Sequence, residues 1–216
     1  RPLVTVIPVG TGNEFAKLVG THGLSPRNAV RQLVHGTPAR FDVGEAWGEY
    51  FVNSLGLGLD YHVPFHLQSV KRLRGTPAYG LALLRALRHY RDVGLTVTIG
   101  ETTYHGRWLT VAIGIGPIEG GGFHLMPGAR PDDGLFDVCA VRPASLLRIV
   151  TLIPLVMMAK HVGMKEVSLA RTTTVHFKGD HPLQLHADGE LRAPGQTELT
   201  VTLKAGVLPV LKVGGR

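Results

Sequence analysis

From residue 41 onward the sequence is dominated by short segments rich in branched and aromatic residues, separated by turns that contain glycine. Segments 41–47 and 50–60 flank Gly48 and Glu49, which predicts a hairpin. Six further strand-like segments follow, at 94–100, 102–116, 134–141, 166–179, 182–190 and 198–206. Many short strands joined by short turns predict an antiparallel β-sandwich or barrel.

Two helical stretches interrupt this series of strands. The first covers about 63–90 and is broken at 75–77, and the second covers 146–163. The uncharged run from Ile149 to Ala159 is much shorter than the ~20 apolar residues of a membrane-spanning helix, and Pro154 interrupts it. We therefore expect the second stretch to be a buried or interfacial helix that packs against the sandwich.

The first 42 residues have a different, α/β character. An apolar strand over 3–9 leads into the turn Gly10-Thr11-Gly12-Asn13 and a helix over 14–20, and Ser25 and Pro26 begin a second helix. One strand and two helices cannot close a core, and the chain does not begin with methionine. We therefore expect the chain to be a fragment or processed piece, with further sequence upstream.

The charge of the chain indicates the class of its partners. With 23 basic and 16 acidic residues the formal net charge is +7, which favours anionic partners such as nucleotides or phospholipid head groups. Several basic residues lie in 69–91, where a solvated helix face is the alternative to a membrane or phosphate patch. The one cysteine, Cys139, lies in an apolar run, which predicts a buried thiol, and no secretory segment is present, which favours an intracellular protein.

The glycine turn at residues 10–13 is the first candidate site. Unpaired N–H groups at the start of a helix can hold a phosphate, and Thr11 could add its hydroxyl. An ordinary tight turn with a helix cap explains the same residues equally well. The spacing matches neither a P-loop nor a dinucleotide-binding fingerprint.

Two acidic segments are the other candidates. Asp132, Asp133 and Gly134 form a turn just before a strand, which suits either magnesium or an ordinary surface turn. Glu190 ends the segment HADGE (186–190) and could act as a general base for a hydroxyl, or could be simply solvated.

Taken in order, these motifs carry a resemblance that none carries alone. PVGTGNEFAK, FVNSLGLGLD, RLRGTPAYG, GGGFHLMPGARPDDGLFDV and LQLHADGE resemble, in the same order, the diacylglycerol kinase catalytic family of lipid kinases. That family includes soluble bacterial diacylglycerol kinases and the sphingosine and ceramide kinases. The resemblance extends over essentially the whole chain, to AGVLPVLKV near its end.

The resemblance implies an α+β fold with two lobes. An antiparallel β-sandwich lobe with helical insertions, residues 43–206, would carry the lipid cleft. Residues 1–42 and 207–216 would be the remnant of an α/β nucleotide-binding lobe, with ATP between the lobes. Thr11 would contact ATP from the turn that it forms with Gly10, Gly12 and Asn13.

The resemblance also implies a magnesium loop and a catalytic base. Asp133 would be the acidic ligand of Mg²⁺, with the carbonyls of Arg130 and Leu135 as further ligands. Glu190 would accept the proton of the lipid hydroxyl as it attacks the γ-phosphoryl group of ATP.

Two departures from the family pattern matter. Glu14 stands where aspartate is usual, which keeps the carboxylate. The family's Gly-Gly-Asp-Gly-Thr loop, which cradles the nucleotide phosphates, is absent and is expected upstream of residue 1. Because phosphoryl transfer depends on positioning and charge neutralisation, we expect the chain on its own to be inactive.

The leading hypothesis is therefore part of an ATP- and Mg²⁺-dependent kinase that phosphorylates a hydroxyl of diacylglycerol or a related lipid. The alternatives are an enzyme like the NAD kinases and a non-catalytic module that binds lipid or membrane. The expected partners are a lipid substrate and an anionic membrane surface rather than nucleic acid. The sequence is also compatible with a homodimer. The expected location is cytoplasmic and peripheral at the membrane.

Overall fold

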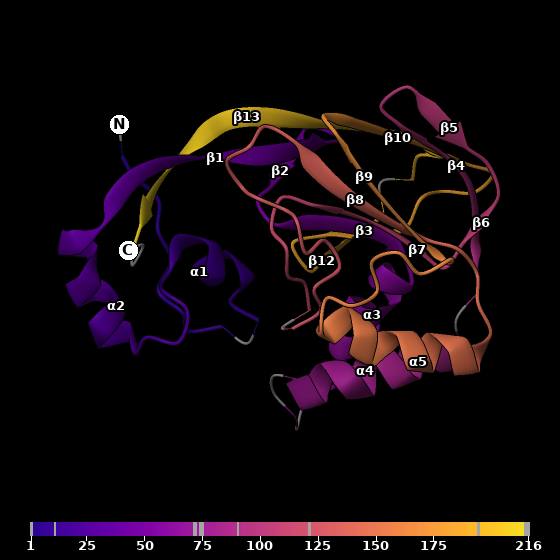
Figure 1. Ribbon diagram of the computed structural model, residues 1–216, viewed down its shortest axis with the longest axis horizontal. Helices are drawn as coiled ribbons and strands as arrows, with labels where there is room; N and C mark the ends of the chain where they lie inside the picture. The colour runs from indigo at the N-terminus through magenta and orange to yellow at the C-terminus, as the bar shows by residue number, and fades with distance from the viewer. Residues whose placement is uncertain are drawn as a thin grey trace.

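Two antiparallel β-sheets form the centre of the molecule, with helices at two places around them (Figure 1). The computed structural model describes residues 2–10, 12–70, 73, 76–89, 91–120, 122–193 and 195–213. The predicted fold class, α+β with an antiparallel sandwich, is confirmed.

The first sheet has the strand order β2-β1-β13-β10-β4-β5, with β6 pairing to β4. Its strands are β1 (Thr37–Ala46), β2 (Glu49–Phe51), β4 (Val93–Ile99), β5 (Thr102–Tyr104), β6 (Arg107–Trp108), β10 (Thr174–Gly179) and β13 (Glu198–Lys212). The second sheet has the order β12-β11-β3-β7-β8-β9. Its strands are β3 (Ser54–Gly58), β7 (Thr110–Gly114), β8 (Phe136–Val141), β9 (Val167–Thr172), β11 (Leu185–Ala187) and β12 (Glu190–Arg192).

The predicted hairpin is present between β1 and β2. Trp47 and Gly48 form its two-residue turn with φ angles of 44° and 86°. Two successive residues with positive φ are typical of the turn type that matches the twist of paired strands.

The main core lies between the two sheets. The rings of Phe51 in β2 and Phe136 in β8 stack across it, with centroids 5.9 Å apart and planes 9° apart. Val97, Phe177 and Val201 from the first sheet are fully buried in the same cluster. Burial of this apolar area is the principal force that holds the sheets together.

The second sheet is buried on its outer face as well. Along β7, Val111 and Ile113 belong to the core between the sheets, whereas Ala112 belongs to a second cluster on the opposite face. Cys139 in β8 lies on that opposite face and is fully buried, as predicted for its thiol. Strands buried on both faces read as continuous apolar runs, which explains the lack of alternation in this part of the sequence.

Three helices cover this outer face. They are α3 (Leu59–Leu67), α4 (Thr76–His89) and α5 (Leu146–Met157), and all lie on the same side of the second sheet (Figure 1). The Ser145 hydroxyl accepts a hydrogen bond from the Arg148 N–H at 3.3 Å and caps α5. The two helical interruptions predicted from the sequence therefore form one layer.

The N-terminal residues pack around the far ends of β1 and β13. They form α1 (Glu14–Val19), α2 (Pro26–Gln32) and a 3₁₀ turn (Leu33–His35), and Val19, Phe41 and Val210 make a small separate core. The β1–β13 pairing runs from Thr37–Lys212 to Ala46–Val201. Both predicted lobe boundaries, near 42 and 207, therefore fall inside one pair of strands.

The strand predicted over 3–9 is not formed. Only a single parallel bridge joins Val4 to Val210, and Leu3, Ile7 and Val9 are exposed. A run of this composition forms a strand when sheet neighbours flank it on both sides, and here it lies beside the end of β13 alone.

Candidate functional site

A cavity of about 360 Å³ lies between the helical layer and the second sheet. It extends from the interior of the helical layer to the N-terminal residues Asn13 and Glu14. Its lining therefore combines residues from both predicted lobes.

Most of the cavity wall is apolar. The helices, the second sheet and the segments before and after β7 contribute Leu59, Val63, Leu83, Leu109, Phe123, Leu125, Cys139, Val141, Ile149, Leu152, Ile153, Val156 and Val167. Burial raises the pKa of the Cys139 thiol to about 12, with Asp60 and Glu119 acting in the same direction. The thiol therefore stays protonated and behaves as part of the apolar wall.

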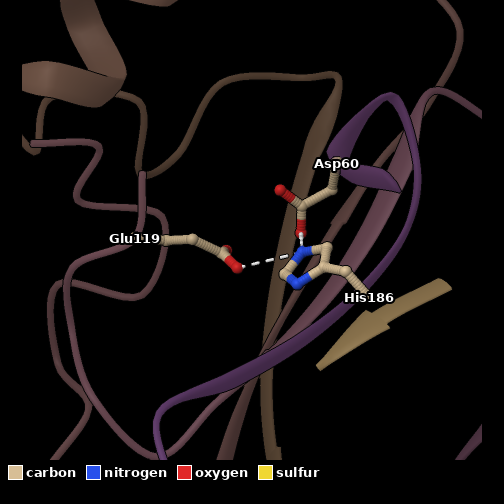
Figure 2. Close-up of side chains that lie close together, drawn as sticks. All are labelled: Asp60, Glu119 and His186. Atoms are coloured by element: carbon tan, nitrogen blue, oxygen red, sulfur yellow. Dashed lines mark ion pairs between the residues drawn. The ribbon is translucent and has the colours of Figure 1, made fainter. Parts of the chain in front are cut away.

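The other end of the cavity is a buried polar cluster of three side chains. Asp60 from α3, Glu119 from the loop after β7, and His186 from β11 converge there (Figure 2). His186 Nε2 lies 3.1 Å from Asp60 Oδ2 and 3.1 Å from Glu119 Oε1. The His186 side chain is only 1% exposed, so the cluster faces the cavity and not bulk solvent.

Two further residues hold this cluster in place. The Ser54 hydroxyl donates a hydrogen bond to Glu119 Oε1 at 2.5 Å. Gly56 lies directly beside the cluster in β3, where any side chain would overlap Asp60 and His186. The glycine-rich strand 54–58 therefore leaves the space in which the three side chains meet.

The protonation of the cluster follows from its contacts. The Gly189 N–H points at His186 Nδ1 at 3.3 Å, which places the proton of a neutral ring on Nε2. Burial opposes a charge on the ring, but the carboxylates of Asp60 and Glu119 outweigh it and raise the pKa of His186. Nε2 thus carries a proton whether the ring is neutral or charged.

Glu119 is the most constrained acid of the cluster. Burial and the neighbouring Asp60 raise its pKa, and His186 and Ser54 act in the opposite direction. Among the described residues, no hydrogen-bond partner meets its buried Oε2 atom. An acceptor of this kind is satisfied when a ligand supplies a donor.

Asp188 fastens the polar end to the rest of the sheet. Its carboxylate accepts hydrogen bonds from the N–H groups of Val52, Asn53 and Ser54 at 2.8, 2.8 and 3.0 Å. Asp188 and Gly189 have φ angles of 50° and 82°, so the β11–β12 turn presents the carboxylate to that loop. Burial raises the pKa of Asp188 although the three N–H groups act against this.

The predicted nucleotide turn lies at the mouth of the cavity. Asn13 closes it, because its Oδ1 accepts from the Gly10 N–H at 3.0 Å and its Nδ2 donates to the Gly10 carbonyl at 2.8 Å. Asn13 lines the cavity, a side chain on Gly12 would require the Glu14 carboxylate to move, and Thr11 lies outside the described residues. The prediction that these residues bind a nucleotide stays a prediction.

Glu190 lies apart from the polar cluster. Its side chain is 71% exposed, and its carboxylate accepts a hydrogen bond from Arg192 Nη2 at 2.8 Å. Arg192 also contacts Glu49 at 3.1 Å. The preceding residue, Gly189, lines the cavity, whereas the Glu190 side chain is paired with Arg192 and is not part of the lining.

The predicted magnesium loop lies before β8 and does not line the cavity. Asp133 accepts a hydrogen bond from the Leu135 N–H at 3.1 Å and forms an ion pair with Arg171 of β9. Asp42 anchors the loop by accepting from the Gly134 N–H at 2.8 Å. Asp133 and the carbonyls of Arg130 and Leu135 are oxygen ligands of the kind that Mg²⁺ prefers, but a metal there would compete with Arg171.

Sequence reasoning missed the polar cluster itself. Asp60, Glu119 and His186 are far apart in the sequence, and only folding brings the helix, the loop and the strand that carry them together. Each does stand beside a glycine-rich or turn segment, at LGLGLD, IEGGG and HADGE. That position is the one signal that could have drawn attention to them.

Comparison with known families decides the relationship of the chain. Residues 53–212 match the YegS C-terminal NAD kinase beta sandwich-like domain, and residues 1–46 match the diacylglycerol kinase catalytic domain. The chain belongs to the diacylglycerol kinase catalytic family. The resemblance inferred from the five motifs is thereby confirmed.

Individual members of the family resemble the chain over most of its length. It is 27% identical to the diacylglycerol kinase of Bacillus subtilis, over 88% of this chain and 63% of the relative. It is 33% identical to a Pseudomonas fluorescens protein named "Probable lipid kinase YegS-like", over 96% of this chain and 68% of that protein. The chain thus spans roughly two thirds of the length of these relatives.

Solved structures share the fold. A diacylglycerol kinase structure from Bacillus anthracis aligns with a TM-score of 0.69 and 16% identity, covering 98% of this chain and 67% of that one. Another structure from the same organism reaches a TM-score of 0.77 at 20% identity, covering 98% and 70%. At this identity the likeness establishes the fold alone.

The contacts of Asp188 predict a local effect of its removal. In Asp188→Ala, the N–H groups of half-buried Val52 and of buried Asn53 and Ser54 lose their acceptor, which should destabilise the protein by about 1–3 kcal/mol. Hydrogen exchange at Val52, Asn53 and Ser54 should accelerate more than at other buried strand amides. Asp180→Ala, at an exposed carboxylate, serves as the control. Equal exchange at 52–54 in both variants would contradict the role given to Asp188.

Proposed function

We propose that this chain forms the lipid-binding part of a kinase that transfers the γ-phosphoryl group of ATP to a hydroxyl of diacylglycerol or a related lipid. One observation carries the proposal: an apolar cavity that ends in a buried polar cluster and reaches the predicted nucleotide turn. Membership of the diacylglycerol kinase catalytic family supports the reaction class.

The apolar part of the cavity suits an acyl chain. Its lining includes Ile149, Leu152 and Ile153 of α5 and Leu59 and Val63 of α3. A wall of this composition offers few hydrogen bonds and favours a hydrocarbon by excluding water. Any acyl chain that enters is thereby directed along the axis between helices and sheet.

The polar cluster suits the hydroxyl-bearing end of the lipid. Glu119 Oε2 is a buried acceptor, so a hydroxyl that reaches it would satisfy an otherwise unpaired atom. The His186 Nε2–H lies between two carboxylates and could donate to the oxygen of the same group. In this role the cluster would hold the lipid hydroxyl in a cavity whose lining also includes Asn13 and Glu14.

The residues that act on ATP remain those of the family pattern. Gly10, Thr11, Gly12 and Asn13 would contact the nucleotide, and Asp133 with the carbonyls of Arg130 and Leu135 would hold Mg²⁺. When bound, the metal would help to neutralise the phosphate charge. Glu190 would take the hydroxyl proton after its carboxylate leaves Arg192 and turns toward the cavity beside Gly189.

Glu119 gives a test of lipid recognition. In the whole protein, Glu119→Gln should weaken binding of dioctanoylglycerol by about 10- to 100-fold, because hydrogen bonds to charged groups contribute about 1.5–3 kcal/mol. Isothermal titration with dioctanoylglycerol and with its 3-O-methyl ether separates the causes. The unaltered protein should prefer the free alcohol, and the variant should bind the two alike. Equal affinity of the unaltered protein for alcohol and ether would contradict the proposed hydroxyl site.

Glu190 gives a test of the catalytic step. Glu190→Gln in the whole protein should lower kcat for lipid phosphorylation by about 10²- to 10⁴-fold while leaving lipid affinity within twofold. Glu198→Gln, at an exposed carboxylate of the first sheet, is the matched control. An unchanged kcat in Glu190→Gln would exclude it as the base. Turnover with NAD but not with lipid as the acceptor would favour the NAD kinase-like alternative.

A further inference from the structure

The helical layer carries an unusual share of the positive charge of the chain. Segments 61–91 and 143–165, which contain most of α3 and all of α4 and α5, hold nine of the 23 lysines and arginines and none of the 16 aspartates and glutamates. Arg88, Arg91, Lys160 and Lys165 are exposed. One of the nine, Arg148, is engaged in an ion pair with the buried Glu166. The described residues of these two segments therefore present basic and no acidic side chains at the surface.

Helix α5 is apolar on both of its faces. Ile149 and Leu152 are buried against the second sheet, whereas Leu147, Val150 and Met158 point outward with exposures of 77%, 47% and 54%. The outward apolar face continues in Leu146, Met157 and Val162, which are also exposed. Apart from Arg148 and Thr151, every residue of α5 is apolar, and a helix with apolar side chains on opposite faces needs an apolar environment on its outer side as well.

Helix α5 is too short to span a bilayer. Twelve residues extend about 18 Å, well short of the ~30 Å of a hydrocarbon core. Among the described residues, no helix combines the length and hydropathy needed to cross a membrane. An apolar helix face of this length beside basic side chains suits a helix that lies in the plane of the interface.

The same helix also forms a wall of the cavity. Ile149, Leu152, Ile153 and Val156 line the cavity on the inner side of α5, while Leu147 and Val150 face outward. On α4, Leu84 is exposed beside the basic residues and Leu83 lines the cavity. A membrane surface in contact with the outer faces of these helices would be separated from the cavity by the thickness of one helix.

We propose that α5 and the exposed face of α4 form a docking surface for an anionic lipid bilayer. Leu147, Val150 and Met158 would insert at the boundary between head groups and acyl chains, and Lys160, Lys165 and Arg88 would contact anionic head groups. Charge complementarity selects this occupant, because an acid-free face of this size favours a negatively charged surface. The role of the cavity in this picture rests on the proposed lipid substrate, whereas docking itself does not.

Vesicle binding of the whole protein tests the proposal. Co-sedimentation should be strong with vesicles of phosphatidylcholine and 30% phosphatidylserine, and weak with phosphatidylcholine alone or at high salt. The double variant L147E/V150E should bind at least tenfold less, and V34E should stay within twofold, since Val34 is equally exposed but lies in the N-terminal 3₁₀ turn. Equal binding by L147E/V150E and the unaltered protein would overturn the proposal.

A fluorescent label reports the contact directly. Cys139 is the one cysteine of the chain and is buried, so Leu147→Cys adds a single accessible thiol for an environment-sensitive dye. The label at position 147 should shift to the blue with anionic vesicles, and a label at Val34→Cys should not. Equal shifts at both positions would place the contact elsewhere.

Two further measurements separate this proposal from other outcomes. On a short-chain lipid dissolved below its micelle concentration, L147E/V150E should keep the rate of the unaltered protein within twofold, and on vesicles it should lose at least tenfold. If the unaltered protein phosphorylates neither form, the proposed function fails while vesicle binding still tests docking. A change from dimer to monomer in light scattering, without loss of vesicle binding, would assign the face to a second copy of the chain.

Discussion

Burial of the second sheet on both faces is the constraint on which the rest of this structure depends. Ile113 and Val138 must meet the first sheet, while Ala112 and Cys139 of the same two strands must be covered from the other side. Covering that outer face requires α3, α4 and α5, which the chain supplies as two insertions between strands. Because small side chains such as Ala112 and Cys139 lie on the outer face, the helices leave a cavity in place of a filled core.

Burial of the polar cluster has a desolvation cost, which its internal contacts partly offset. Two carboxylates beside one imidazole would be expensive to bury separately, and their mutual contacts offset part of the desolvation. The space for them depends on Gly56, and their alignment depends on Ser54 and on the loop that Asp188 holds. A polar group kept at the end of an apolar cavity is poorly explained by stability, and the proposed lipid binding would give it a use.

The sequence predicted those features that depend on local pattern. The hairpin at Gly48, most of the strands, the two helical insertions and the buried Cys139 each follow from residue type and periodicity within a few positions. Features that depend on distant neighbours were harder to predict. Residues 3–9 have strand composition but form only one bridge, because strand formation also requires adjacent strands.

The same distinction between local pattern and distant neighbours applies to the candidate site. The motif residues Asn13 and Gly189 line the cavity, and the roles that the family pattern gives to these motifs stay predictions. Glu190 belongs to the same motif, yet its exposed side chain pairs with Arg192, an interaction between neighbours two residues apart that the motif does not reveal. Asp60 and Glu119 could not be paired with His186 from the sequence, since nothing local specifies that a helix, a loop and a strand will converge.

The central claim is that the cavity under α5 holds the lipid with its hydroxyl at Asp60, Glu119 and His186. A crystal structure of the whole protein with a diacylglycerol brominated at the end of one acyl chain would test this directly through the anomalous signal of bromine. The account predicts a bromine peak between the inner face of α5 and the second sheet, near Leu152, with the glycerol hydroxyl in contact with Glu119. A bromine peak on the outer face of the helices, or a lipid head group remote from Glu119, would contradict it.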